Sequence, residues 1–172
     1  MGPRRNPERA GSAPLLVDSA RSGTNPSSLT TKRRGEIAEA AFLHKAASLG
    51  FSVAKPWGES DRYDFIVDVN GRCWRVQVKS AHTSALNGYT FHACGNVHKN
   101  RYTRKDIDFI VGYVVPDDAW YVIPIEAYAN KTTIKVFPSS KRRMSRFEIY
   151  REAWDSMRAP DLSRATEAND TQ

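Results

Sequence analysis

An Asn-Gly pair at positions 70 and 71 lies between two runs in which apolar and polar side chains alternate. Residues 63–69 lead into the pair, and residues 72–79 lead out of it. Asn-Gly favours a two-residue type I′ turn, because both central residues of that turn take positive φ. The sequence therefore predicts a tight β-hairpin whose register places Val69 opposite Arg72.

This register sorts the side chains of the hairpin onto two faces, because alternate residues of a strand point to opposite sides. On one face, Asp64 lies directly opposite Gln77, and Lys79 follows two residues further along. A slip of one residue would separate Asp64 from the other two. The opposite face is apolar and is predicted to belong to the core; it carries Phe65, Val67, Val69, Trp74, Val76 and Val78.

The polar trio has the composition that metal-dependent phosphodiester cleavage requires. A carboxylate and a neutral oxygen ligand can hold Mg²⁺ in its octahedral oxygen shell. A nearby lysine can orient the attacking water and stabilise charge on the phosphate. The alternative is an ordinary Asp and Lys on a solvated face of the sheet.

Two motifs in the chain resemble those of known nucleases. Asp64 followed by Gln77-Val78-Lys79 resembles the PD-(D/E)xK nuclease signature. Upstream, the segment from Gly35 to Glu39 is similar to the Gly-x-x-x-Glu helix start of archaeal Holliday-junction resolvases and of intron-encoded homing endonucleases in the same superfamily. The resemblance extends from about Lys32 to Tyr128.

The chain departs from the PD-(D/E)xK pattern at two positions. Tyr63 stands where a proline usually precedes the acid, and Gln77 stands where the pattern has a second acid. A Gln-x-Lys version resembles the homing-endonuclease branch. With a neutral amide at position 77, the metal-binding site has one negative charge fewer, so we expect weaker metal affinity. Binding of DNA without cleavage is therefore a second hypothesis.

The resemblance implies an α/β (α+β) fold, a restriction-endonuclease-like mixed sheet flanked by helices. It implies a DNA substrate, a homo-oligomer (dimer or tetramer), and Mg²⁺ as the cofactor, with Mn²⁺ as a substitute. The implied metal ligands are Glu39, Asp64, the amide oxygen of Gln77 and the carbonyl of Val78, while Lys79 positions the water. Glu36 is a candidate to support the site or to stabilise the first turn of its helix. The literal Pro-Asp pair at 116–117 is explained by turn chemistry instead.

The remaining elements are predicted from periodicity and from helix-capping residues. A helix begins at Thr30 or Thr31 and ends at Leu49 before Gly50. Further strands are expected at 51–54, 89–93, 108–115, 120–125 and 134–137, and a capping box at Thr103–Asp106. A closing helix is expected over 146–157, and the domain spans 31–158 between disordered tails at 1–30 and 159–172. The apolar face of the first helix is predicted to contain Ile37, Ala40, Ala41, Leu43 and Ala47.

The charge of the chain fits a nucleic-acid partner. The formal net charge is +7 and the pI is about 9.6, and cations on a protein surface bind phosphates with release of counterions. Ordinary solvated loops are the alternative for each basic cluster. Tyr102 is predicted to stack on a base or sugar. The predicted DNA-binding residues are Lys99, Arg101, Tyr102, Arg104, Lys105, Lys141, Arg142 and Arg143.

Two observations bear on cellular location. Cys73 and Cys94 are too few for a disulfide framework, so reduced thiols are expected. No apolar run approaches the ~20 residues that a membrane helix requires. We therefore expect a cytoplasmic protein without a membrane partner. The competing hypotheses are a DNA-binding module with the same fold and no turnover, and an RNA-directed or tail-driven binding protein; metal-dependent cleavage separates the enzyme from the module.

Overall fold

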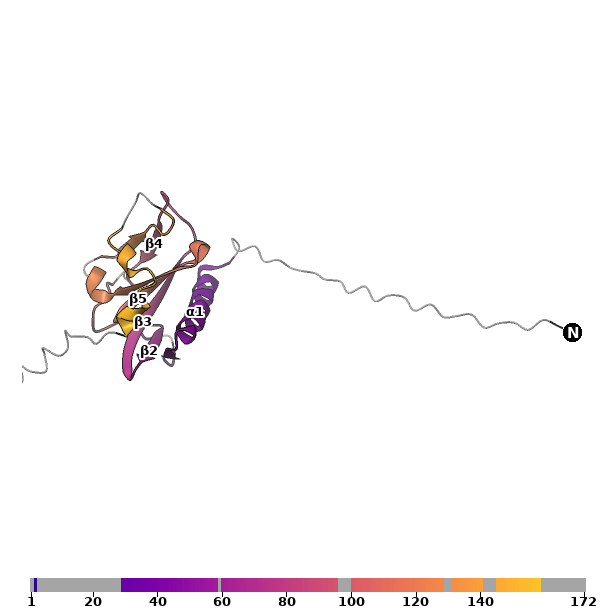
Figure 1. Ribbon diagram of the computed structural model, residues 1–172, viewed down its shortest axis with the longest axis horizontal. Helices are drawn as coiled ribbons and strands as arrows, with labels where there is room; N and C mark the ends of the chain where they lie inside the picture. The colour runs from indigo at the N-terminus through magenta and orange to yellow at the C-terminus, as the bar shows by residue number, and fades with distance from the viewer. Residues whose placement is uncertain are drawn as a thin grey trace, which may run out of the picture.

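The computed structural model describes residue 2 and residues 29–58, 60–95, 100–128, 131–140 and 145–158. Within these ranges, one long helix precedes a five-stranded mixed sheet and a two-stranded ribbon. Figure 1 shows the helix along one side of the sheet, with the ribbon strand β4 away from it. The predicted tails lie outside the described residues apart from 2, 29 and 30.

The sheet has the order β1-β2-β3-β5-β6, and only the β3–β5 pair within it is parallel. The ribbon pairs β4 with β7 in antiparallel fashion. The predicted α+β fold with a mixed sheet is confirmed. The bounds are α1 Thr31–Ser48, β1 Ser52–Ala54, β2 Phe65–Val69, β3 Arg72–Ala81, β4 Tyr89–His92, β5 Phe109–Val114, β6 Ala119–Pro124 and β7 Thr133–Val136, with 3₁₀ turns η2 Val115–Asp117, η3 Ile125–Tyr128, η4 Glu148–Tyr150 and η5 Trp154–Met157.

The hairpin of β2 and β3 forms in the predicted register, with Val69 paired to Arg72. Asn70 and Gly71 both take positive φ, 55° and 81°, as a type I′ turn requires. The Gly71 N–H also donates to the Asp68 carboxylate at 2.9 Å. Local turn chemistry therefore suffices to set the alignment of every residue in the hairpin.

Helix α1 begins as predicted, because the Thr30 hydroxyl oxygen accepts a hydrogen bond from the Arg33 N–H at 3.2 Å. Of its predicted apolar face only Ala41 packs against the core, and the rest of that prediction is wrong. Ile37 and Leu43 are exposed, and the buried stripe recurs every fourth residue, at Ala38, Phe42 and Ala46. A stripe at this spacing lies on one side of a helix, and the two alanines let the backbone approach the sheet.

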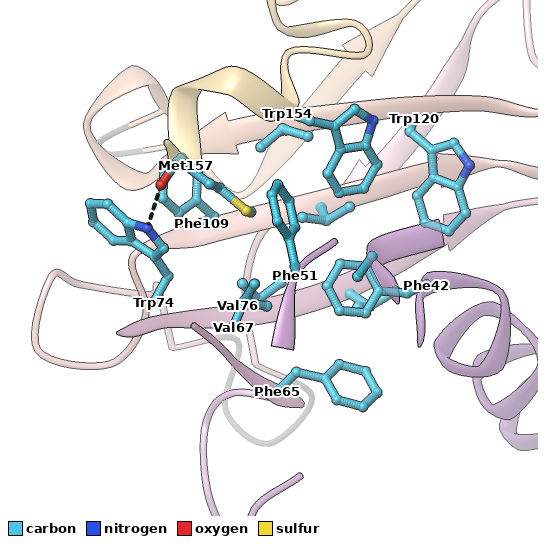
Figure 2. Close-up of a cluster of buried hydrophobic side chains, with 14 of the residues drawn as sticks. Phe42, Phe51, Phe65, Val67, Trp74, Val76, Phe109, Trp120, Trp154 and Met157 are labelled. Atoms are coloured by element: carbon cyan, nitrogen blue, oxygen red, sulfur yellow. Dashed lines mark hydrogen bonds between the residues drawn. The ribbon is translucent and has the colours of Figure 1, made fainter. Parts of the chain in front are cut away.

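The first core lies between α1 and the sheet (Figure 2). Phe42 stacks on Phe65 with ring centroids 5.1 Å apart. The Trp74 indole N–H donates to the Met157 carbonyl oxygen at 2.8 Å, a buried bond that attaches the end of the described chain to the hairpin. The apolar face predicted for the hairpin is thus confirmed as a core surface.

The closing helix predicted over 146–157 is wrong, since the segment forms only the short turns η4 and η5. Glu152, between them, has a φ of 49°. Its N–H donates to the Trp120 carbonyl at 2.8 Å, and its carboxylate accepts from the Trp120 N–H at 2.9 Å. These bonds satisfy the backbone N–H and carbonyl of Trp120 in the edge strand β6, and they hold Glu152 in a non-helical conformation.

The face of the sheet that carries Gln77 is also covered, although the sequence predicted only a polar surface there. The β4–β7 ribbon, η3 and the segment around Tyr102 form a second core on the sheet. Gly112 of β5 makes this packing possible. A Cβ at this position would lie 2.6 Å from the buried ring of Phe91. Since Gly112 pairs with Lys79, the close approach lies beside the polar trio.

Replacing Gly112 with alanine is therefore expected to destabilise the protein by about 1–3 kcal/mol through overpacking. Gly35→Ala provides a matched control. It lies in α1 with open space around the added Cβ, so the same change there should stabilise by roughly 0.5–1 kcal/mol. Urea unfolding of both variants measures the two effects. Equal stability changes would show that Phe91 can move away from the added methyl group.

Candidate active site

Asp64 lies immediately before β2, and its carboxylate is held by the neighbouring strand. Oδ2 of Asp64 accepts a hydrogen bond from the Val78 N–H at 2.7 Å and a second from the Gln77 amide nitrogen Nε2. The Asp64 N–H donates to the Val76 carbonyl at 2.9 Å. The hairpin thus brings Asp64 and Gln77 together, as its register predicted.

The environment of Asp64 makes its negative charge costly. Burial raises the pKa of this carboxyl from 3.8 to about 6, with Glu39 contributing in the same direction. The Val78 N–H and the charges of Lys79 and Lys55 oppose this shift of the pKa without cancelling it. A carboxylate in this position is stabilised by an added cation.

Among the charged, amide, hydroxyl-aliphatic and histidine side chains of the described ranges, only Gln77 is buried, with 8% of its surface exposed. Its Nε2 donates to Asp64 and also to the Val78 carbonyl oxygen, at 3.3 Å. Its Oε1 accepts from the Tyr102 hydroxyl at 3.2 Å. Both ends of the amide are therefore satisfied, which removes most of the cost of burying it.

Lys79 extends from the same strand face as Gln77. Burial lowers the pKa of the Lys79 ammonium, while the charge of Asp64 opposes the shift. Its Nζ lies 5.8 Å from the centroid of the Tyr102 ring. Across the parallel β3–β5 pair it faces Gly112, whose lack of a side chain lets the Phe91 ring pack at that position.

Glu39 of α1 contributes to the electrostatic field at Asp64. Its carboxylate forms an ion pair with Lys55, with Nζ and Oε2 2.8 Å apart. Lys55 follows β1 and is also close enough to influence Asp64. Lys55 is not among the residues predicted from the sequence; the signal for it was its place after β1, whose end pairs with the start of the hairpin.

Glu36 does not take the position that the sequence predicted. It is the sixth residue of α1, beyond the first turn, which contains no acidic residue. Its exposed carboxylate pairs with Arg33 at 3.1 Å. The predicted stabilisation of the first turn by Glu36 is therefore wrong, and its support of the site stays a prediction.

Tyr102 is a buried part of the site, although the sequence placed it on a surface loop. Burial, with the charge of Asp64, raises the pKa of its phenol to about 12, so the hydroxyl keeps its proton. The Arg62 guanidinium lies 5.1 Å from the ring centroid, and no sequence pattern indicated this arginine. Stacking on DNA would require the Tyr102 ring to leave these contacts.

The other predicted DNA-binding residues are distributed unevenly. Arg101, Arg104 and Lys105 are exposed, and Arg104 forms an ion pair with Glu126 at 2.7 Å. Arg75 donates to the carbonyl oxygens of Arg104, at 2.7 Å, and of Lys105. This fixes the backbone of the loop. Lys99, Lys141, Arg142 and Arg143 lie outside the described residues.

The residues present fit a hard cation. Asp64 Oδ2 and the Val78 carbonyl oxygen both point at one atom, Gln77 Nε2, so an electropositive group is required at that position. No group of three or more His, Cys, Asp or Glu in the described residues is arranged to hold a metal ion, so the donors at this point are one carboxylate and neutral oxygens. Oxygen donors of this kind, with few carboxylates, suit Mg²⁺ or Mn²⁺, which retain several waters, better than Zn²⁺.

The chain has a mixed sheet in which an aspartate meets a strand that carries Gln-Val-Lys. A helix with a glutamate precedes this sheet and packs against it. These features together are typical of one class of nucleases. The chain matches the PD-(D/E)XK endonuclease family over residues 29–157 and belongs to that family. Among solved structures, the bacterial homing endonuclease I-Ssp6803I is similar, with 33% identity and a TM-score of 0.64. The match covers 83% of this chain and 99% of the homing endonuclease.

The restriction-endonuclease-like fold expected from the sequence is thereby confirmed. No protein among the curated ones matches the chain. Within the described ranges, none of the helices has the length and apolarity needed to span a membrane.

The raised pKa of Asp64 predicts a pH-dependent gain in stability for Asp64→Asn. The folded-state pKa exceeds the unfolded value, so ionisation of Asp64 costs stability as pH rises between about 4 and 6. The neutral variant avoids that cost, and its oxygen still accepts from Val78. We expect its free energy of unfolding to exceed that of the wild type by on the order of 2 kcal/mol above pH 6.

Denaturant titrations from pH 4 to pH 8, without divalent metal, measure this difference. The gain should shrink to a small remainder as pH falls to 4, where Asp64 is protonated in the folded state and partly protonated in the unfolded state. A difference that stays constant across this range would contradict the assignment of a raised pKa to Asp64.

Proposed function

We propose that this protein is a Mg²⁺-dependent DNA endonuclease that uses a Gln-x-Lys version of the PD-(D/E)XK site. The observation that carries the proposal is the partly buried Asp64 carboxylate, which lies against Gln77 and beside Lys79. Membership of the endonuclease family supports it, as does the likeness to a homing endonuclease.

Asp64, Glu39, the Gln77 amide oxygen and the Val78 carbonyl would hold the metal. When bound, Mg²⁺ supplies charge neutralisation at the phosphate and activates a water, and Mn²⁺ can replace it. Lys79 would orient the water and stabilise the charge that develops on the phosphate. Its partial burial strengthens that interaction, since little solvent screens it.

The surroundings of the site suit a DNA backbone. Arg101 and Lys105 are exposed on the loop that carries Tyr102, and the net charge of +7 favours phosphate contacts. We propose Lys99, Lys141, Arg142 and Arg143 as further contacts. A homo-oligomer, either a dimer or a tetramer, would bring two sites to the two strands. We propose a cytoplasmic location.

A DNA-binding module without turnover is the second candidate. One observation favours it: Gln77 is neutral and donates to Asp64, so the site holds fewer anionic ligands than a two-acid site. Incubation with plasmid and branched DNA in Mg²⁺ or Mn²⁺ separates the two candidates. Cleavage that requires the metal supports the enzyme, and intact DNA under all conditions supports the module.

Lys79→Ala is expected to reduce single-turnover cleavage by about 100-fold or more while DNA affinity changes little, because Lys79 acts at the transition state. Lys135→Ala is a matched control. That lysine also lies over an aromatic ring, Phe137, but it belongs to β7 of the ribbon. A wild-type rate for Lys79→Ala at saturating protein would make this lysine an ordinary phosphate contact.

Neutralising Arg101 and Lys105 together should have the opposite effect. Contacts away from the scissile bond bind ground and transition states equally, so affinity falls and the saturated rate is kept. Each true phosphate contact removed should lower the slope of log affinity against log salt by about 0.9. An unchanged slope would show that these two residues do not meet phosphates.

Gln77→Glu should bind Mg²⁺ more tightly. Without metal, the variant places a second carboxylate where Nε2 now donates to Asp64, so stability should fall by roughly 1–3 kcal/mol. Metal should restore it. Thermal melting with and without Mg²⁺ measures both effects, and a metal-induced shift no larger than that of the wild type would place Gln77 outside the ligand set.

A further inference from the structure

We propose that Tyr102 is a positioning residue whose hydroxyl lets the Gln77 carboxamide make a half-turn between a metal-free and a metal-bound orientation. The inference rests on the proposed function, since it concerns how Gln77 would become a metal ligand. It is carried by the hydrogen bonds at the two ends of one buried amide.

In the metal-free protein, the inner end of the amide must donate. The ionised carboxylate of Asp64 and the carbonyl of Val78 are acceptors only. Both lie within hydrogen-bonding distance of Gln77 Nε2. An oxygen at the same point would face two other oxygens without a proton between them. The observed orientation, with Nε2 inward, is therefore the one that the metal-free site requires.

A metal ligand at the same position must be an oxygen. A half-turn of the carboxamide about its last side-chain bond exchanges Oε1 and Nε2 at almost unchanged positions, and this torsion has no strong preference between the two. After the half-turn, Oε1, the Asp64 carboxylate and the Val78 carbonyl oxygen all face the same point. The amide nitrogen at this point is thus replaced by an oxygen ligand without any movement of β3.

The outer end of the amide must then change from acceptor to donor. Gln77 is buried, so either atom left unpaired at that end would carry a cost. The Tyr102 hydroxyl now donates to Oε1 at 3.2 Å. A hydroxyl can also accept, so the same group can receive a hydrogen bond from Nε2 after the turn. A backbone N–H or C=O could serve only one orientation.

The hydroxyl is held in place independently of the amide. The Tyr102 ring is buried in the second core and lies under the Arg62 guanidinium. Arg62 also donates to the carbonyl oxygens of Asn100 and Arg101, at 3.2 and 3.1 Å, and so holds the loop before Tyr102. The same ring contacts the ammonium of Lys79, so one side chain positions both members of the Gln-x-Lys pair.

The half-turn can be observed directly by NMR on DNA-free protein with isotope-labelled glutamine. Without metal, the Gln77 side-chain amide protons point toward Asp64. With saturating Mg²⁺, we expect new cross-peaks from these protons to the Tyr102 ring protons beside the hydroxyl. An unchanged cross-peak pattern, while backbone signals of the hairpin report bound Mg²⁺, would overturn the inference and leave the proposed function intact.

Tyr102→Phe tests the role of the hydroxyl while keeping the ring. After the half-turn a buried N–H would face the phenyl ring, and an unpaired buried N–H is tolerated less well than an unpaired carbonyl oxygen. Mg²⁺ affinity, measured by calorimetry without DNA, should therefore fall by about two- to tenfold. Tyr121→Phe is the matched control, because its hydroxyl donates to Glu148 at 2.8 Å in the same core.

Repeating the test in the Gln77→Glu variant distinguishes a positioning role of Tyr102 from a role in packing alone. A carboxylate presents oxygen at both ends and needs no half-turn, so adding Tyr102→Phe there should leave Mg²⁺ affinity unchanged. An equal loss in that background, or wild-type affinity for Tyr102→Phe alone, would overturn the positioning role. A wild-type protein that binds no Mg²⁺ would overturn the proposed function together with this inference.

Discussion

The hydrogen bond from the Val78 N–H to the Asp64 carboxylate is the interaction on which the candidate site depends. It spans 2.7 Å between β3 and the residue that precedes β2, so it forms only when the hairpin has its native register. The same bond keeps the carboxylate beside Gln77 and within reach of the charges of Glu39, Lys55 and Lys79. Burial at this position raises the pKa of Asp64, and a cation would offset that cost. One turn of two residues, Asn70-Gly71, therefore determines where the chemistry is located.

Because the sheet is covered on both faces, the side chain at position 77 is buried, and a neutral amide suits that position. The first core packs α1 against one face, and the second core packs the ribbon and Tyr102 against the other. Gln77 is buried beside Tyr102 of the second core, where an unpaired carboxylate would cost free energy. A neutral side chain with three hydrogen-bonding partners, namely Asp64, Val78 and Tyr102, can be buried there at little cost. The neutral residue at position 77 and the closed surroundings of the site are thus two aspects of the same packing.

The basic residues near the site have two different roles, which composition cannot separate. Arg62 pairs with Asp106 at 3.5 Å, and Arg75 pairs with Asp108 at 3.2 Å. Both arginines also hold backbone carbonyls of the loop that carries Tyr102. These two arginines hold the loop against the sheet, whereas Arg101 and Lys105 on the same loop are exposed, as the proposed phosphate contacts require. The net charge therefore overstates the number of side chains available to phosphates.

The sequence by itself determined the hairpin, its register, the meeting of Asp64 with Gln77 and Lys79, and the capped start of α1, because each follows from interactions between residues close in the chain. Only the tertiary structure decided which face of α1 is buried, since alanines and larger apolar residues occur all around that helix. It also decided that residues 146–157 form turns, because Glu152 bonds to the distant strand β6. Tyr102, Lys55 and Arg62 join the site only through packing between segments far apart in sequence. Alternation within one strand fixes the direction of a side chain, but the groups that come to face it are set by the assembly of the whole sheet.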